Sequence, residues 1–99
     1  MIVHFFAAAR AAAGVAEQNI SVSAVADSQT GSSQASDKIT LAQLISYLES
    51  VHTGRTPSGL TMAQILAQCS FLVNGQASEP SAPLNPDARV DVLPPFAGG

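Results

Sequence analysis

Residues 40–51, with the sequence TLAQLISYLESV, decide the fold class of this chain. Apolar side chains recur at helical spacing on one face of the stretch, at Leu41, Leu44, Ile45, Leu48 and Val51. Thr40 and Gln43 match a capping box, in which the hydroxyl accepts from an orphan N–H and the amide reaches back to the backbone. Gly54 and Pro57 end the pattern. We expect an amphipathic helix that covers one face of a sheet.

Strand patterns lie on both sides of this helix. Residues 2–6 are rich in β-branched and aromatic side chains, and residues 19–25 alternate between two faces, so we expect two antiparallel strands. Residues 71–73 lead into an Asn-Gly pair, a hairpin signal because both residues tolerate positive φ, with a short partner strand at 76–78. Residues 90–93 give a last strand. This order predicts an α+β fold, a small mixed sheet with one main helix packed across it.

Shorter segments fill the remaining sequence. Residues 7–13 are alanine-rich and favour a helix that Gly14 ends. A second capping pair, Thr61 and Gln64, begins a short helix with an apolar stripe formed by Met62, Ile65, Leu66 and Cys69. Residues 27–37 (DSQTGSSQASD) contain no large apolar side chain, so we expect a mobile polar loop. Residues 79–87 carry three prolines and predict an irregular loop.

Length and charge limit the possible functions. The chain has 99 residues, which suits a single domain over residues 1–99, and its formal net charge is -3. Four Lys and Arg against seven Asp and Glu leave no basic footprint, so we expect no nucleic-acid partner. No stretch reaches the roughly 18–20 apolar residues of a membrane span, so we expect no membrane partner. The N-terminal apolar stretch lacks a basic region before it and Arg10 interrupts it, which predicts mature, cytoplasmic protein.

The last six residues, 94–99, form a distinctive tail, PPFAGG. Pro94 and Pro95 favour an extended polyproline II conformation, and the six residues could reach about 20 Å beyond the domain at roughly 3.3 Å per residue. Gly98 and Gly99 have no side chains, so the terminal carboxylate could enter a passage too narrow for other dipeptides. We expect a flexible tail that another enzyme activates.

Several blocks of sequence, in order and at the right spacing, carry a resemblance to a known family. The blocks are Val3-His4-Phe5-Phe6-Ala7 with Arg10 and Gly14, Thr40-Leu41-Ala42-Gln43-Leu44, Val73-Asn74, Pro83-Leu84, and residues 90–99. The sequence resembles the ubiquitin-like sulfur carriers, specifically the small subunit of molybdopterin synthase (the MoaD family). The loop at 27–37 is longer than the family usually has, and residues 53–60 match nothing in it.

This resemblance implies a ubiquitin-like β-grasp fold and a chemistry centred on Gly99. An adenylating enzyme related to ubiquitin-activating enzymes would use ATP to convert the Gly99 carboxylate to an acyl-adenylate. Sulfur from a persulfide donor would then replace AMP and leave a thiocarboxylate. The tail would insert into the large synthase subunit, in a heterotetramer, and donate sulfur to cyclic pyranopterin monophosphate. The chain would bind no cofactor or metal and would not be an enzyme on its own, whereas the complex would be a sulfurtransferase.

The resemblance also implies a surface for partners. If strand alternation places Val92 in the core, Leu93 points outward beside the tail. The residues expected to contact partners are Phe6, Arg10, Ala77, Leu93, Pro94, Pro95, Phe96 and Ala97, with Gly98 giving access to the reacting carboxylate. Arg10 is as well explained as a solvated helix arginine, and the apolar members as ordinary exposed side chains.

The cysteine, the two histidines and two of the aspartates are not expected to take part in catalysis or metal binding. Cys69 is expected to be a packed thiol, and as the only cysteine it can form no internal disulfide. His4 and His52 are far apart in sequence with no carboxylate motif, so we expect satisfied or solvated histidines. Asp87 is expected in a turn and Asp91 on an exposed strand face.

Three alternatives stay open. A carrier for thiamine or cysteine biosynthesis shares the fold and the terminal Gly-Gly, although the residues before that pair favour the molybdopterin branch. A ubiquitin-like modifier would instead form isopeptide bonds with target lysines, so its product is a covalent protein conjugate. An interaction domain with an inert tail would keep its function without Gly98 and Gly99.

Overall fold

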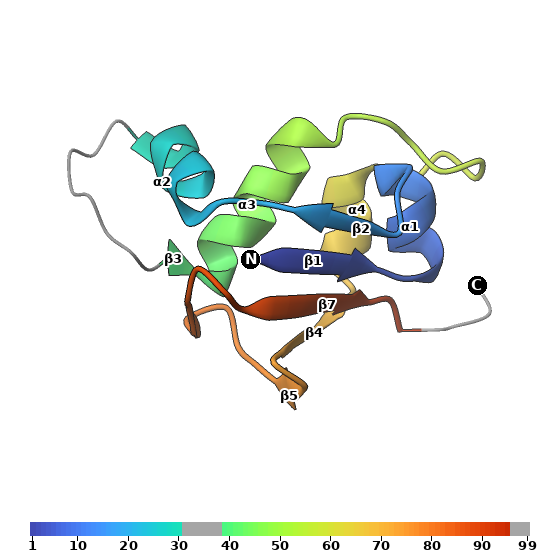
Figure 1. Cartoon of the computed structure of the whole chain (residues 1–99). Helices are drawn as coiled ribbons and strands as arrows, with labels where there is room; N and C mark the ends of the chain where they lie inside the picture. Colours follow the sequence, from blue (N-terminus) through green and yellow to red (C-terminus); the bar gives the residue numbers. More distant parts are fainter. Residues whose placement is uncertain (31–38, 96–99) are drawn as a thin grey trace.

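A five-stranded mixed sheet organises the chain in the computed structural model, which describes residues 1–30 and 39–95, with side chains described for 1–26 and 39–95 (Figure 1). The strand order is β2-β1-β7-β4-β5, with β7 at the centre, parallel to β1 and antiparallel to β4. The outer pairs, β1 with β2 and β4 with β5, are antiparallel. The strand bounds are β1 Ile2–Phe5, β2 Glu17–Asn19, β4 Ser70–Val73, β5 Gln76–Ala77 and β7 Arg89–Leu93.

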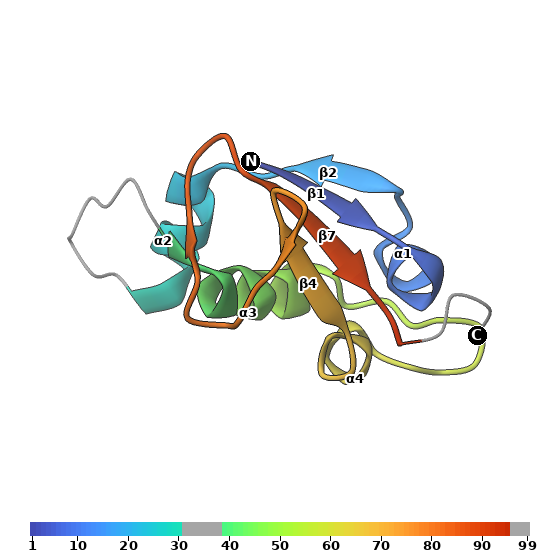
Figure 2. The ribbon, with the colours of Figure 1, turned by 90° about the horizontal axis from the view of Figure 1, so that it is seen from below.

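The main helix, α3 (Leu41–Val51), lies across one face of this sheet (Figure 2). Leu41, Leu44 and Leu48 are fully buried against the inward-facing side chains of the central strands, which are Val3, Phe5, Val90 and Val92. The α+β prediction is therefore confirmed. Ile45 is partly buried, whereas Val51 is 44% exposed, so its assignment to the apolar face was wrong. The last turn of α3 extends past the sheet-covering leucines.

Both predicted capping boxes are present. The Thr40 N–H donates to Gln43 Oε1 at 2.7 Å, and the Gln43 N–H donates to Thr40 Oγ1 at 3.2 Å. The same reciprocal pair joins Thr61 and Gln64 at the start of α4 (Met62–Leu66). Each box satisfies two backbone donors that would otherwise lack a helical partner.

The segment after β2 differs from the prediction. The strand expected at 19–25 covers Glu17–Asn19, antiparallel to β1 as expected, and the chain then forms α2 (Val22–Thr30). Ser21 Oγ accepts the N–H of Ala24 at 3.2 Å, as a helix cap does. Val22 and Val25 are buried three residues apart on a helix that packs against α3. A short apolar pattern fits both the two-residue period of a strand and the 3.6-residue period of a helix, and burial against α3 favours the helix here.

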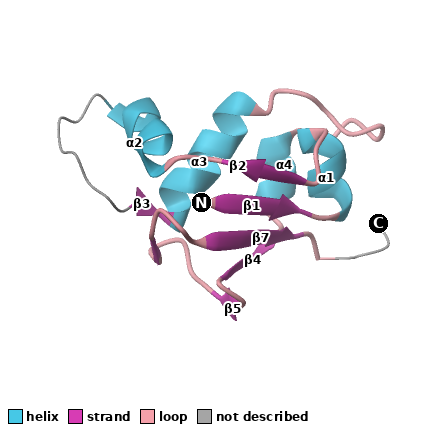
Figure 3. Cartoon of the chain, in the orientation of Figure 1, coloured by secondary structure: helices cyan, strands magenta, loops and turns pink. Residues whose placement is uncertain are grey.

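The polar segment predicted as a mobile loop at 27–37 begins within this helix. Residues 27–30 are the last part of α2, so the prediction was wrong there, and residues 31–38 lie outside the described residues. A second sheet was also missed. It pairs β3 (Ile39–Thr40) with β6 (Pro83–Leu84), and β6 lies inside the segment 79–87 that was predicted to be an irregular loop (Figure 3). Leu84 is fully buried, which anchors this segment beside the start of α3.

The predictions for the helix at residues 7–13 and for the Asn-Gly hairpin turn are confirmed. The first helix, α1 (Ala7–Ala13), ends at Gly14 with a φ of 79°, and the small side chains of Ala9 and Ala12 are buried. Asn74 and Gly75 have φ of 52° and 84°, the signs that a two-residue hairpin turn between β4 and β5 requires. Of the described helices, none is long and apolar enough to cross a membrane.

Candidate functional site

The central strand β7 carries the chain out of the sheet. Val92 is fully buried and Leu93, the next residue, is half-buried on the opposite, open face of the sheet, as the alternation predicted. Proline lacks a backbone N–H, so Pro94 cannot continue the ladder. Leu93, Pro94 and Pro95 form the segment that we call the tail root.

Phe6 lies beside the tail root. Phe5 and Val92 are the last register pair between the parallel strands β1 and β7, so Phe6 and Leu93 follow them side by side. Ala7 has a φ of 50° and turns the chain from β1 into α1. Phe6 is 41% exposed and, with Ala7, Leu93 and Pro94, lines a hollow of about 260 Å³. The structure thus brings together three of the predicted partner-binding residues, Phe6, Leu93 and Pro94.

A second hollow of about 220 Å³ also borders the tail root. Its apolar lining comes from α1, α4, Leu60 and both prolines, and Pro94 lines both hollows. Leu60 is 37% exposed. Leu60 was not among the predicted partner residues, although a lone large apolar side chain within the polar stretch 53–61 is a signal that could have identified it. Ser58, Gln68, Ala8 and Ile65 complete the lining.

The loop that presents Leu60 is held by a buried threonine. Thr56 is 8% exposed, and its Oγ1 accepts the Leu60 N–H at 3.1 Å and lies 2.9 Å from Ser58 Oγ. The Thr56 N–H donates to the Leu60 carbonyl at 2.9 Å, and the Gly59 N–H donates to the Thr56 carbonyl at 2.8 Å. Gly59 has a φ of 90°, which disfavours any other residue at that point of the turn. These hydrogen bonds make the loop a fixed wall of the hollow.

The structure places the other predicted partner residues differently. Ala77 pairs with Leu72 at the far edge of the sheet and lines a separate groove, so it does not join the tail-root hollows. Arg10 is exposed on α1, and among the described residues it forms no ion pair. Pro95 lines the second hollow. Phe96, Ala97, Gly98 and Gly99 lie outside the described residues and stay predictions.

Among the described residues, the side chains that line the two hollows carry no charge, and none is an acid, a base or a thiol. The one cysteine lies elsewhere. Its Sγ donates to the Ile65 carbonyl at 3.1 Å, and burial raises the pKa of the Cys69 thiol to about 11, which keeps the thiol protonated and poorly nucleophilic at neutral pH. The packed-thiol interpretation agrees with this geometry.

The two histidines both lie beside β2. His4 Nε2 is 3.8 Å from Glu17 Oε2, which agrees with the expectation of a satisfied histidine. His52 Nε2 lies 2.8 Å from Gln18 Oε1, and its ring packs edge-on against Phe5. Burial lowers the pKa of His52. Within residues 1–30 and 39–95, no group of three or more metal-ligating side chains gathers.

Asp91 corrects another expectation. It is 8% exposed, although alternation places it on the open face of the sheet. It lies on the central strand, where its register partners are His4 on one neighbouring strand and Leu72 on the other, and lateral neighbours on both sides reduce the exposure of an outward side chain. Its Oδ1 accepts from Arg89 Nε at 3.0 Å, so the buried carboxylate is paired. The open face is therefore polar near its middle and apolar at the tail root.

The comparisons with known proteins come from a family model and from solved structures. The structure of SAMP1 from Haloferax volcanii is similar over 100% of this chain and 98% of that chain, with a TM-score of 0.64 and 17% sequence identity. This likeness shows a ubiquitin-like β-grasp fold. No curated protein matches the chain. The model of the ThiS family matches residues 20–99, a span that includes the main helix, the central strand and the Gly-Gly tail. The chain therefore belongs to the ThiS family, the ubiquitin-like sulfur carriers of the MoaD/ThiS superfamily.

Proposed function

We propose that this carrier is the sulfur-donating small subunit of molybdopterin synthase and that Gly99 carries the sulfur. The observation that carries the proposal is the way in which the tail root leaves the sheet. The central strand of the sheet leads directly into Pro94 and Pro95, flanked by exposed apolar side chains, and residues 96–99 with the Gly-Gly pair follow these prolines. A rigid pair of prolines between the folded domain and a bare Gly-Gly end suits insertion of the end into a deep, narrow site.

The chemistry at Gly99 proceeds in three steps. A carboxylate is a poor electrophile, so an adenylating enzyme first transfers AMP from ATP to the carboxylate and releases pyrophosphate. A persulfide sulfur then forms a bond to the carbonyl carbon while the bond to AMP breaks, and reduction of the resulting acyl disulfide by a thiol leaves the thiocarboxylate. Of the described side chains, those that line the tail-root hollows include no acid, base or thiol, so in this proposal the reactive groups come from partners. Small carriers of this family are not enzymes themselves.

The thiocarboxylate is a soft nucleophile that donates its sulfur inside the large synthase subunit. We propose that Phe6, Leu93 and Leu60 contact that subunit around the entering tail, with Arg10 nearby on α1. The acceptor is cyclic pyranopterin monophosphate, and two such transfers build the dithiolene. The chain itself binds neither cofactor nor metal in this proposal, and it works in the cytoplasm.

The test is reconstitution of the transfer. Thiocarboxylated carrier is mixed with the large subunit and cyclic pyranopterin monophosphate, and the dithiolene product and the carrier mass are followed together. We expect molybdopterin to form as the carrier returns to its carboxylate mass. A carrier lacking Gly99 is the matched control and should give no product.

Parallel reactions of the thiocarboxylated carrier with other acceptors separate the alternatives. Sulfur transfer to thiamine or cysteine precursors, with none to the pterin, assigns the carrier to one of those pathways and contradicts the molybdopterin proposal. A covalent conjugate between the tail and protein lysines, with no free sulfur product, identifies a modifier.

A further inference from the structure

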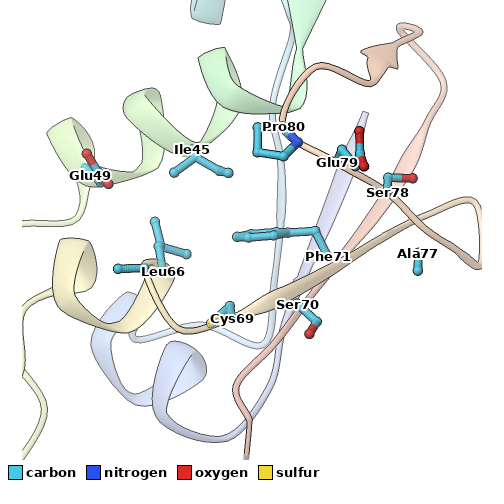
Figure 4. A pocket seen from close by; sticks show the side chains of 11 residues that line it. Ile45, Glu49, Leu66, Cys69, Ser70, Phe71, Ala77, Ser78, Glu79 and Pro80 are labelled. Atoms are coloured by element: carbon cyan, nitrogen blue, oxygen red, sulfur yellow. The ribbon is translucent and has the colours of Figure 1, made fainter.

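A groove separate from the tail root lies between α3, α4 and the β4–β5 edge of the sheet, with a volume of about 530 Å³ (Figure 4). Ile45, Leu66 and Phe71 give it an apolar lining. It shares no lining residue with either tail-root hollow. A segment bound here would therefore leave the tail root uncovered.

The groove exists because β5 is short. β5 pairs only with Leu72 and Val73, so the part of β4 that holds Phe71 has no strand beyond it. One hydrogen bond, from the Ser78 N–H to the Phe71 carbonyl at 3.0 Å, still joins the two segments just beyond the last register pair. Phe71 points toward α3 yet stays only half-buried. An aromatic ring on the inner side of the sheet is thus accessible from the edge.

Within the part of the chain that the structure describes, the charged side chains that line the groove are both negative. Glu49 on α3 and Glu79 after β5 stand on either side of the apolar lining (Figure 4). Both are exposed, and the ion pairs among the described residues involve neither of them. Cys69 adds no reactivity, because its thiol donates to the Ile65 carbonyl. The groove therefore combines an apolar lining with two uncompensated carboxylates.

We propose that this groove binds an extended basic segment of a partner protein, with one large apolar side chain on Phe71 and Leu66 and Lys or Arg side chains toward Glu49 and Glu79. Charge complementarity argues for this occupant, since the carboxylates repel anionic ligands and acidic segments. A second copy of this chain cannot supply the segment. Its cations stand singly, at positions 10, 38, 55 and 89. The proposal goes beyond the sulfur-carrier function and is independent of it.

The size of the charge effect can be bounded. Each exposed ion pair contributes between about 1.5- and 5-fold to affinity. Two pairs together give roughly 2- to 25-fold, and the effect weakens at high salt because exposed charges are screened. An acidic segment of the same shape loses both pairs and adds like-charge repulsion of similar size, so we expect a basic segment to bind at least about threefold more tightly at low salt.

The experiment is an NMR titration of the full-length ¹⁵N-labelled chain with three capped synthetic peptides. The first is Gly-Lys-Ser-Phe-Ser-Lys-Gly, the second has Glu in place of both Lys, and the third has Ala in place of Phe. We expect the first peptide to shift the amide signals of Ile45, Phe71 and Ser78 and to bind at least about threefold more tightly than the second. The third should bind weakly or not at all. The advantage of the first over the second should shrink at high salt.

Variants assign the effect to the groove. The double variant Glu49→Gln with Glu79→Gln should bind the first two peptides equally, whereas Glu17→Gln, on the distant strand β2, should change nothing. Ala67→Lys puts a cation into the exposed rim of the groove and should weaken the basic peptide. Equal binding of basic and acidic peptides to the unaltered chain, no shifts, or shifts confined to the tail root would each overturn the proposal. The titration uses the carboxylate form without partner enzymes, so its result does not depend on sulfur transfer.

Discussion

Replacement of Phe6 by Ala tests whether the tail root is a docking surface. A buried phenylalanine removes roughly 150–250 Å² from water, so the exposed 41% of Phe6 amounts to about 80 Å² that a partner can cover. At about 25 cal/mol per Å² this area contributes about 2 kcal/mol, and most of it is lost in Phe6→Ala. Since 1.4 kcal/mol is a tenfold change, we expect about 25-fold weaker binding to the large subunit in titration calorimetry.

The matched control is Val51→Ala. Val51 is 44% exposed at the end of α3, so it offers a similar exposed fraction of apolar side chain away from the tail root. We expect its affinity to stay within about twofold of the unaltered chain, because surface substitutions outside specific contacts have small effects. Urea unfolding of both variants checks that the folded population is maintained. Unchanged affinity in Phe6→Ala, or equal losses in the two variants, would refute the assignment of Phe6 to the docking surface.

Three further predictions concern His52, Cys69 and Thr56. Burial lowers the pKa of His52, so the unfolded state binds a proton first as the pH falls through 6.5, and the free energy of unfolding should decrease from about pH 7 downward until the lowered pKa is passed. Urea unfolding at several pH values should show this decrease, and His52→Gln should reduce it more than the control His4→Gln does. Burial raises the pKa of Cys69 to about 11, so a maleimide should label the folded chain slowly at pH 7 and much faster in urea, whereas equally fast labelling of the folded chain would show that the thiol is not held in its buried position. Thr56→Val leaves the Leu60 N–H without its side-chain acceptor and should cost about 1–3 kcal/mol of unfolding free energy, with Ser58→Ala as the milder comparison; a loss below about 0.5 kcal/mol would mean that Thr56 does not hold the loop.

Local signals were sufficient where a few neighbouring residues determine the geometry. The capping pairs at Thr40 and Thr61 marked both helix starts, and the Asn-Gly pair marked the hairpin, because each device acts within four residues. The segment at 22–30 was misassigned because two valines and alternating serines suit either a strand or a helix until α3 supplies a packing partner. The pairing of β3 with β6 joins residues more than forty positions apart, so no local pattern reports it.

The candidate site could also be predicted from the sequence only where a local pattern determines the geometry. Alternation along β7 placed Val92 inside and Leu93 outside, and this needed no knowledge of neighbouring strands. The approach of Phe6 to Leu93 depends on the parallel register between β1 and β7, which joins distant parts of the sequence; the family resemblance named both residues but did not give this register. Asp91 was misplaced because an outward side chain on a central strand is covered by its lateral neighbours. Ala77 lies two strands from β7 and lines another groove.

The central claim is that the Gly99 carboxylate becomes a thiocarboxylate. Intact-protein mass spectrometry tests it directly, after expression of the chain with its adenylating enzyme and a sulfur source. The account predicts a mass gain equal to sulfur in place of one oxygen, located in the C-terminal peptide. An unchanged mass, with the same enzyme shown to be active on another carrier, would contradict it and favour an interaction domain with an inert tail.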